Sequence, residues 1–249
     1  MSLFDLVLVQ PLLNILFGIY ALIPGHDFGV AVIILTVLVR LALWPLVTKQ
    51  LHSQRAMQKM APEIAKVKEK AAGDRQKETE MLMELYKEKG TSPFAPLLPL
   101  LIQLPIFIAL YSVLRHSVDV AAIAKYCYGF VAHLSAVADV IGHKINFSPS
   151  LFGLIDLTKS SPVLAVTAAG AQFFQTRQLQ PKNQPMDDQA KMMSGMTYVF
   201  PIITALVALS LPSALALYWT FTSVVAIYQQ RVVLLRDAHE MEEVKGGKK

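Results

Sequence analysis

Long apolar runs alternate with polar segments along this chain, and each run is about as long as a membrane-spanning helix. Phe28–Val47 holds twenty residues, of which only Thr36 and Arg40 are polar. At about 1.5 Å per residue, such a helix is about 30 Å long, which matches the hydrocarbon core of a bilayer. The pattern predicts an all-α polytopic membrane protein with five transmembrane helices: 28–47, 93–115, 160–177, 192–211 and 212–235.

The segment before the first run, residues 1–27, is apolar but interrupted. Gln10 and Asn14 lie four residues apart, so they share one face of a helix. This pattern indicates an amphipathic helix that lies in the outer membrane interface. The alternative is a further membrane span over Leu3–Pro24.

A strongly charged segment, residues 48–92, follows the first predicted span and contains ten basic and seven acidic side chains. Apolar residues recur there at the helical spacings of three and four: Met57, Met60, Ile64, Val67 and Ala71. Gly73-Asp74 interrupts this pattern, and Gly90 is suited to end a second helix. The segment therefore predicts a helical hairpin in water. Its methionines fit either a plain packed seam or a surface for promiscuous binding.

Basic residues also occur in two later polar segments, the connection 178–191 and the tail 236–249, whereas none precedes Arg40. Cytoplasmic segments of membrane proteins are enriched in Lys and Arg. The hairpin, the connection and the tail are therefore predicted to be cytoplasmic, with the N-terminus outside. Residues 116–159 would then be extracytoplasmic, and we expect short amphipathic helices there.

The composition agrees with a membrane protein, since 54% of the 249 residues are hydrophobic, 16% are charged and the mean hydropathy is +0.45. A single cysteine excludes an internal disulfide. The predicted spans contain no Asp or Glu, no phosphate-binding loop pattern occurs, and the histidines lack metal-ligand spacing. We expect a protein that is not an enzyme and uses no cofactor and no metal.

Arg40 is the most unusual residue, because a guanidinium at the centre of a membrane helix costs about 2.5–3.5 kcal/mol on insertion scales. It either faces water, a partner or a substrate, or it is a structural cation hydrogen-bonded to carbonyls of a helix break near Pro45. Other polar or amphipathic side chains of the predicted spans could line a site with it: Thr36, Gln103, Gln172, Gln175, Tyr218, Trp219, Thr222 and Ser223.

Several of these motifs resemble those of the YidC-type insertases (the YidC/Oxa/Alb family). Thr36-Val-Leu-Val-Arg40 with Trp44-Pro45-Leu46 is similar to the first core helix of that family. Pro96–Tyr111 resembles the second core helix, and Pro212-Ser213 with Tyr218-Trp219 resembles the last. The likeness extends over about residues 3–235, and we expect a minimal form of the family without the large periplasmic domain of many members.

The resemblance implies a function: insertion of newly made membrane proteins from the cytoplasm into the bilayer, through a hydrophilic groove and without ATP hydrolysis by this chain. It implies that Arg40 is the groove arginine and that Thr36, Tyr218 and Trp219 contact the substrate. Gln103, Gln172 and Gln175 are placed in the groove by polarity alone. The implied partners are membrane protein clients and lipid in the bacterial inner membrane, with the Sec translocon and the ribosome as further candidates.

Two other functions are considered from the residues. A small solute or anion transporter would use Arg40 as its binding charge, but it predicts matched broken helices in an internal repeat, which the sequence does not show. A purely structural subunit that tethers other membrane proteins would tolerate Arg40→Ala.

Overall fold

The computed structural model describes residues 2–90, 92, 98–145, 147, 149–180 and 188–246, and this part is mostly helical, in agreement with the all-α prediction. Residues 93–97 of the second predicted span and 181–187 of the predicted connection lie outside the described residues. The helices are η1 (Asp5–Val9, a π-helix), α1 (Gln10–Leu22), α2 (Phe28–Ala42), α3 (Trp44–Ala71), α4 (Arg75–Glu88), α5 (Leu98–His116), α6 (Val120–Tyr126), α7 (Gly129–Ala132), α8 (Ser135–Ile141), α9 (Pro162–Gln178), α10 (Asp188–Ser210) and α11 (Ser213–Gly246).

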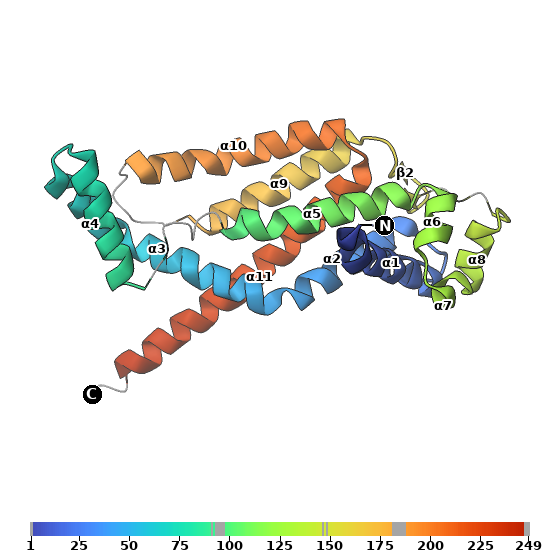
Figure 1. The fold of residues 1–249 in the computed structure, drawn as a ribbon, viewed down its shortest axis with the longest axis horizontal. Helices are drawn as coiled ribbons and strands as arrows, with labels where there is room; N and C mark the ends of the chain where they lie inside the picture. The colour runs from blue at the N-terminus through green and yellow to red at the C-terminus, as the bar shows by residue number, and fades with distance from the viewer. Residues whose placement is uncertain are drawn as a thin grey trace.

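The molecule is elongated, with the α3–α4 hairpin at one end and the short helices α6–α8 at the other (Figure 1). Helices α5, α9, α10 and α11 run between the two ends, and α11 packs against α9, α2 and α3. The expected short helices of 116–159 are present as α6–α8. They are followed by a small antiparallel hairpin, β1 (Ser150–Leu151) and β2 (Ile155–Asp156), that the sequence pattern did not predict.

The predicted helix 28–47 is broken at Leu43, where α2 and α3 meet at a bend of 63°. Pro45 lies in the first turn of α3, where it has no N–H to donate and where its ring opposes continuation of the preceding helix. As a result α2 ends at Ala42, and the first helix of the hairpin begins at Trp44 rather than Thr48.

Helix length tests the membrane prediction only in part. Among the described residues, the continuous helical stretch Asp5–Leu22 is long and apolar enough to cross a membrane by itself, and the bent pair α2–α3 could form a second span. Shorter apolar helices cover Leu101–His116 and Thr197–Ser210. The number of five transmembrane helices therefore stays a prediction. We predicted that the N-terminal segment lies in the interface, but Asp5–Leu22 is long enough for the alternative, a further membrane span.

Besides a buried apolar core, the protein exposes large apolar side chains and buries several polar ones. Large apolar side chains are exposed on α9 and α10, for example Val166 (69% exposed) and Leu206 (61%), whereas Thr204, Gln229 and Gln230 are buried. Many exposed large apolar side chains on neighbouring helices are typical of a surface that faces lipid or a partner.

The polar face of α1 contacts protein. Asn14 Nδ2 donates to Tyr126 O (2.9 Å), Asn14 Oδ1 accepts from Tyr128 N (2.6 Å), and Gln10 Nε2 donates to Tyr126 O (3.2 Å). The pairing of Gln10 and Asn14 thus joins α1 to the turn between α6 and α7. At the same end, the backbone of Leu151 in β1 packs directly against Gly29 of α2, because an added Cβ at Gly29 would lie 2.9 Å from Leu151 Cα.

The apolar residues of the two hairpin helices pack against each other. Met60 and Ile64 of α3 pack on Leu85 and Tyr86 of α4, with Met57, Val67 and Leu82 around them. The predicted break lies where expected, since Gly73 has φ +90° and the Asp74 side chain accepts from the amides of Gln76 and Lys77 to start α4. Gly90 has φ +61°, which suits the residue after a helix end.

Helix α11 begins at a fixed point and extends further than predicted. Its first amides are satisfied by the loop after β2, since Ser213 N donates to Lys159 O (2.8 Å) and Ala214 N to Leu157 O (3.1 Å). In that loop, hydrogen bonds from Thr158, followed by the Lys159 ammonium, lower the pKa of Asp156 to about 2. The helix continues to Gly246, through most of the predicted tail, and projects away from the bundle (Figure 1).

Candidate functional site

Arg40 lies in the last turn of α2, three residues before the helix break, and it contacts α11 in two ways. Its Nη2 donates to Thr222 O (3.1 Å), and its own carbonyl accepts from Gln229 Nε2 (3.3 Å). Carbonyls in the last turn of a helix lack intrahelical partners, so the Gln229 amide fills a need that the break creates. The guanidinium therefore bonds to a carbonyl of α11, and the Arg40 carbonyl near the helix break accepts a hydrogen bond from Gln229.

The polar atoms of this contact that are buried without a partner within the described part of the chain include Arg40 Nε, a donor, and Gln229 Oε1, an acceptor. Leaving a polar group buried and unpaired costs about 1–3 kcal/mol. A bound molecule that both accepts and donates hydrogen bonds would remove that cost. The contact therefore has the properties of a binding site as well as those of a structural link.

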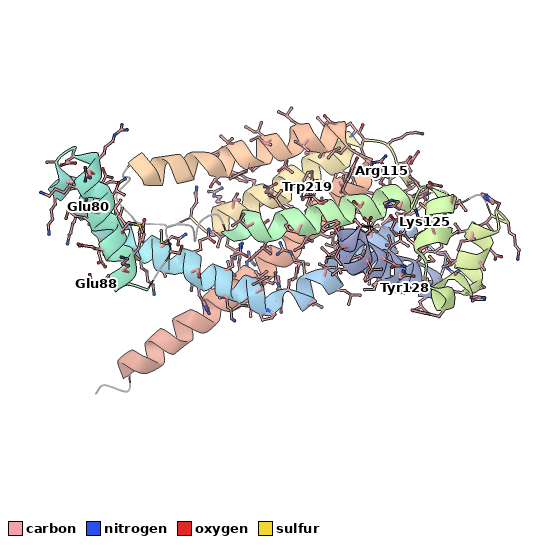
Figure 2. The ribbon with its side chains drawn as sticks, viewed as in Figure 1. Glu80, Glu88, Arg115, Lys125, Tyr128 and Trp219 are labelled. Atoms are coloured by element: carbon pink, nitrogen blue, oxygen red, sulfur yellow. The ribbon has the colours of Figure 1, made fainter. Side chains whose placement is uncertain are left out.

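Tyr218 and Gln103 extend the polar contact toward α5. Tyr218 lies one turn before Thr222 on α11 and is 3% exposed, and its hydroxyl accepts from Gln103 Nε2 (2.8 Å). Trp219 stacks on Phe107 of α5, with ring centroids 5.2 Å apart and an angle of 7° between the planes. Figure 2 shows Trp219 in the middle of the molecule, close to α5. We call Arg40, Gln103, Tyr218, Thr222 and Gln229 the Arg40 site.

The remaining predicted site residues have other surroundings or partners than Arg40. Thr36 is 1% exposed and donates to Val32 O (2.7 Å) of its own helix, so its hydroxyl is already used. Ser223 is buried on α11. Gln172 of α9 accepts from the Thr204 hydroxyl of α10, and Gln175 lies half-buried one turn further on.

The predicted residues therefore divide into two groups. One surrounds Arg40 at the contact of α2, α5 and α11, and the other joins α9 to α10. No hydrogen bond between Gln172 or Gln175 and Arg40 occurs among the residues that the structure describes. A common groove for all of them stays a prediction.

Sequence reasoning missed Gln229 as a site residue and missed a second polar region. A cavity of about 200 Å³ lies between α3, α9 and α11, and its lining is rich in glutamine. The available signals were Gln54 and Gln58, one turn apart on a helix, and the adjacent pair Gln229-Gln230 within an apolar helix.

The chemistry of the Arg40 site is that of binding. It offers a cation, a phenol and neutral amides inside an apolar bundle, without a carboxylate or imidazole among its members. Within the described ranges no group of three or more His, Cys, Asp or Glu side chains could hold a metal ion. Such a site can hold a polar or acidic group by hydrogen bonds and charge attraction.

Comparison with known proteins gives a family match over most of the chain. Residues 19–240 match the 60Kd inner membrane protein family. A membrane protein insertase YidC of Fusobacterium nucleatum is 34% identical over 212 residues, which cover 85% of this chain and 88% of that protein. Proteins of the same name from Streptomyces avermitilis (33% identical over 226 residues) and Magnetococcus marinus (32% over 235 residues) match 84% and 94% of this chain. The chain spans only 52% and 36% of the length of these last two relatives.

Proposed function

Because the chain belongs to the 60Kd inner membrane protein family, we propose that it is a membrane protein insertase, the function that the names of its relatives carry. It would move newly synthesised membrane proteins from the cytoplasm into the bilayer without hydrolysing ATP itself. The observation that supports this most directly is the Arg40 site, where a cation with an unpartnered buried N–H lies within an apolar bundle.

The physical basis is a transient attraction followed by partition into lipid. At 4 Å and an effective dielectric constant near 20, a carboxylate in the client's tail would gain about 4 kcal/mol from Arg40. That is enough for capture and small enough for release. The client's own helix then gains about 0.3–0.6 kcal/mol for each central Leu, Ile, Phe or Val that enters the bilayer. The attraction to Arg40 and the partition of the client helix into lipid are thus sufficient to drive insertion, and no catalytic step is required.

The arrangement in the membrane is part of the proposal. Five spans would place the N-terminus outside and the α3–α4 hairpin, the 178–191 connection and the basic end of the chain in the cytoplasm. The hairpin would then receive clients or partners such as the Sec translocon, and the tail could contact the anionic ribosome. The insertase names of the relatives favour this function over an anion transporter.

The test is reconstituted insertion. The full chain in liposomes receives a single-span client with a short acidic tail, and protease protection scores insertion. We expect the wild type and Arg40→Lys to insert the client and Arg40→Ala to lose most insertion. Arg115→Ala, which changes an exposed arginine at the far end of α5 (Figure 2), is the matched control.

Thermal unfolding of each variant separates function from folding, because Arg40→Ala also removes the bond to Thr222 O. Equal insertion by all variants would mean that the charge of Arg40 is not needed for insertion and that Arg40 has a structural role. Failure of the folded wild type to insert any client would refute the proposed function.

A further inference from the structure

A second polar site lies at the hairpin end of the bundle, between α3, α9 and α11. It is a cavity of about 200 Å³ that is lined partly by leucine and valine and partly by five amide side chains and one cation: Gln54, Gln58, Gln178, Gln180, Gln230 and Arg55. We call it the glutamine cavity. At about 30 Å³ per water molecule it has room for about six or seven waters, or for a short stretch of polypeptide.

Hydrogen bonds to the surrounding protein hold part of this lining in place. Gln58 Nε2 donates to Leu179 O (2.8 Å), and Gln178 Nε2 donates to Ile227 O (3.3 Å). These bonds join α3 to the end of α9, and α9 to α11. The amides are therefore oriented before any ligand arrives, which lowers the entropy cost of binding.

Gln230 shows what the cavity requires. It is 3% exposed, it lines the cavity, and its Oε1 has no hydrogen-bond partner among the described residues. An amide oxygen accepts hydrogen bonds and repels anions, so a ligand beside it must present a donor. A phosphodiester, which carries acceptors only, does not meet this requirement.

The position of the cavity connects it to the Arg40 site. Gln229, the residue before Gln230, donates to the Arg40 carbonyl. Adjacent residues of α11 therefore belong to the two sites, and a single extended chain could contact both.

We propose that the glutamine cavity binds the main chain of the client polypeptide, with a backbone N–H of the client donating to Gln230 Oε1. This rests on the proposed insertase function. A glutamine amide carries the same kinds of donor and acceptor as a peptide bond, and every client residue except proline offers a backbone N–H whatever its side chain. The cavity would thus hold client tails irrespective of sequence, whereas Arg40 favours acidic ones.

The test removes the backbone donor from the client. A photo-crosslinking amino acid replaces Leu234, which lines the cavity, or Leu235, which is exposed and serves as the matched position. The full chain in liposomes is given a synthetic single-span client with a neutral tail, either unmodified or N-methylated along the tail. We expect N-methylation to lower crosslinking at 234 about two- to tenfold, the value of one hydrogen bond, and to leave the yield at 235 unchanged.

Gln230→Leu should lower crosslinking of the unmodified client to the N-methylated level and abolish the difference between the two clients. Gln76→Leu, an exposed glutamine on α4, should behave as the wild type. Equal crosslinking of both clients at 234 would overturn the proposal. Protease protection in the same vesicles scores insertion separately. If the client is inserted but its crosslinking at 234 does not depend on N-methylation, only the glutamine cavity is refuted as a client site. If the client is crosslinked but not inserted, the insertase function is refuted.

Discussion

Replacing Asn14 by leucine should open the turn between α6 and α7 and expose the thiol of Cys127. Asn14 makes two hydrogen bonds across this contact, to Tyr126 O at 2.9 Å and from Tyr128 N at 2.6 Å, and Cys127 is the residue between them. Each bond contributes about 0.5–1.5 kcal/mol net, and leucine also leaves the Tyr128 N–H without its partner. The contact should lose about 2–3 kcal/mol, so the open fraction should rise about 30- to 150-fold.

Alkylation of Cys127 measures this opening without any engineered label, because the chain has one cysteine. Burial raises the pKa of the Cys127 thiol to about 11, so at pH 8 it carries about a hundredfold less thiolate than a thiol of ordinary pKa 9.0. Wild-type alkylation by iodoacetamide at pH 8 should therefore be slow and should occur through the open state, in which the thiol has its ordinary pKa. In Asn14→Leu the rate at pH 8 should rise by the opening factor, up to the rate of a free thiol.

Two variants calibrate the result. Gln10→Leu removes only the bond of 3.2 Å to Tyr126 O and should accelerate alkylation about two- to fivefold. Gln76→Leu, far away on the hairpin, should have no effect. If folded Asn14→Leu is alkylated at the wild-type rate, packing and not the Asn14 hydrogen bonds holds the turn, and the reasoning is refuted.

Three further predictions follow from contacts elsewhere in the chain. Gly29→Ala should destabilise the protein by about 1–3 kcal/mol in denaturant titration, since the added Cβ would lie 2.7 Å from a side-chain carbon of β1, whereas Gly18→Ala, with open space around it, should not. Because the pKa of Asp156 is lowered to about 2 from 3.8, its stabilisation is complete above pH 3.8 and is lost as the pH falls toward 2. The difference in melting temperature between the wild type and Asp156→Asn should therefore be present at pH 5 and vanish near pH 2; a constant difference would contradict this. Gln103→Leu and Tyr218→Phe should show a coupling of about 0.5–1.5 kcal/mol in a double-mutant cycle of unfolding, and additive effects would mean that their 2.8 Å contact contributes nothing.

The local pattern of the sequence was sufficient for the features that depend on neighbouring residues. The hairpin seam from Met57 to Val67 and its break at Gly73-Asp74 follow from helical spacing and from backbone conformations that glycine permits. A helix break near Pro45 was considered only as part of the structural interpretation of Arg40, and the predicted span 28–47 ran through the bend at Leu43. A proline indicates that the hydrogen bonds of a helix are interrupted, but the residues packed around that position decide whether the helix bends or ends.

The sequence by itself determined that the protein is helical and strongly apolar, that Arg40 is a cation within an apolar run, and that its motifs are those of an insertase family. Only the tertiary structure decided which polar residues meet. It joined Arg40 to Thr222 and Gln229, 182 and 189 residues away, and it placed Gln172 with Thr204 instead. Helical spacing fixes the face of the helix on which a side chain lies. Which other helix packs on that face depends on contacts between segments distant in the sequence, and the spacing of residues along the chain carries no information on those contacts.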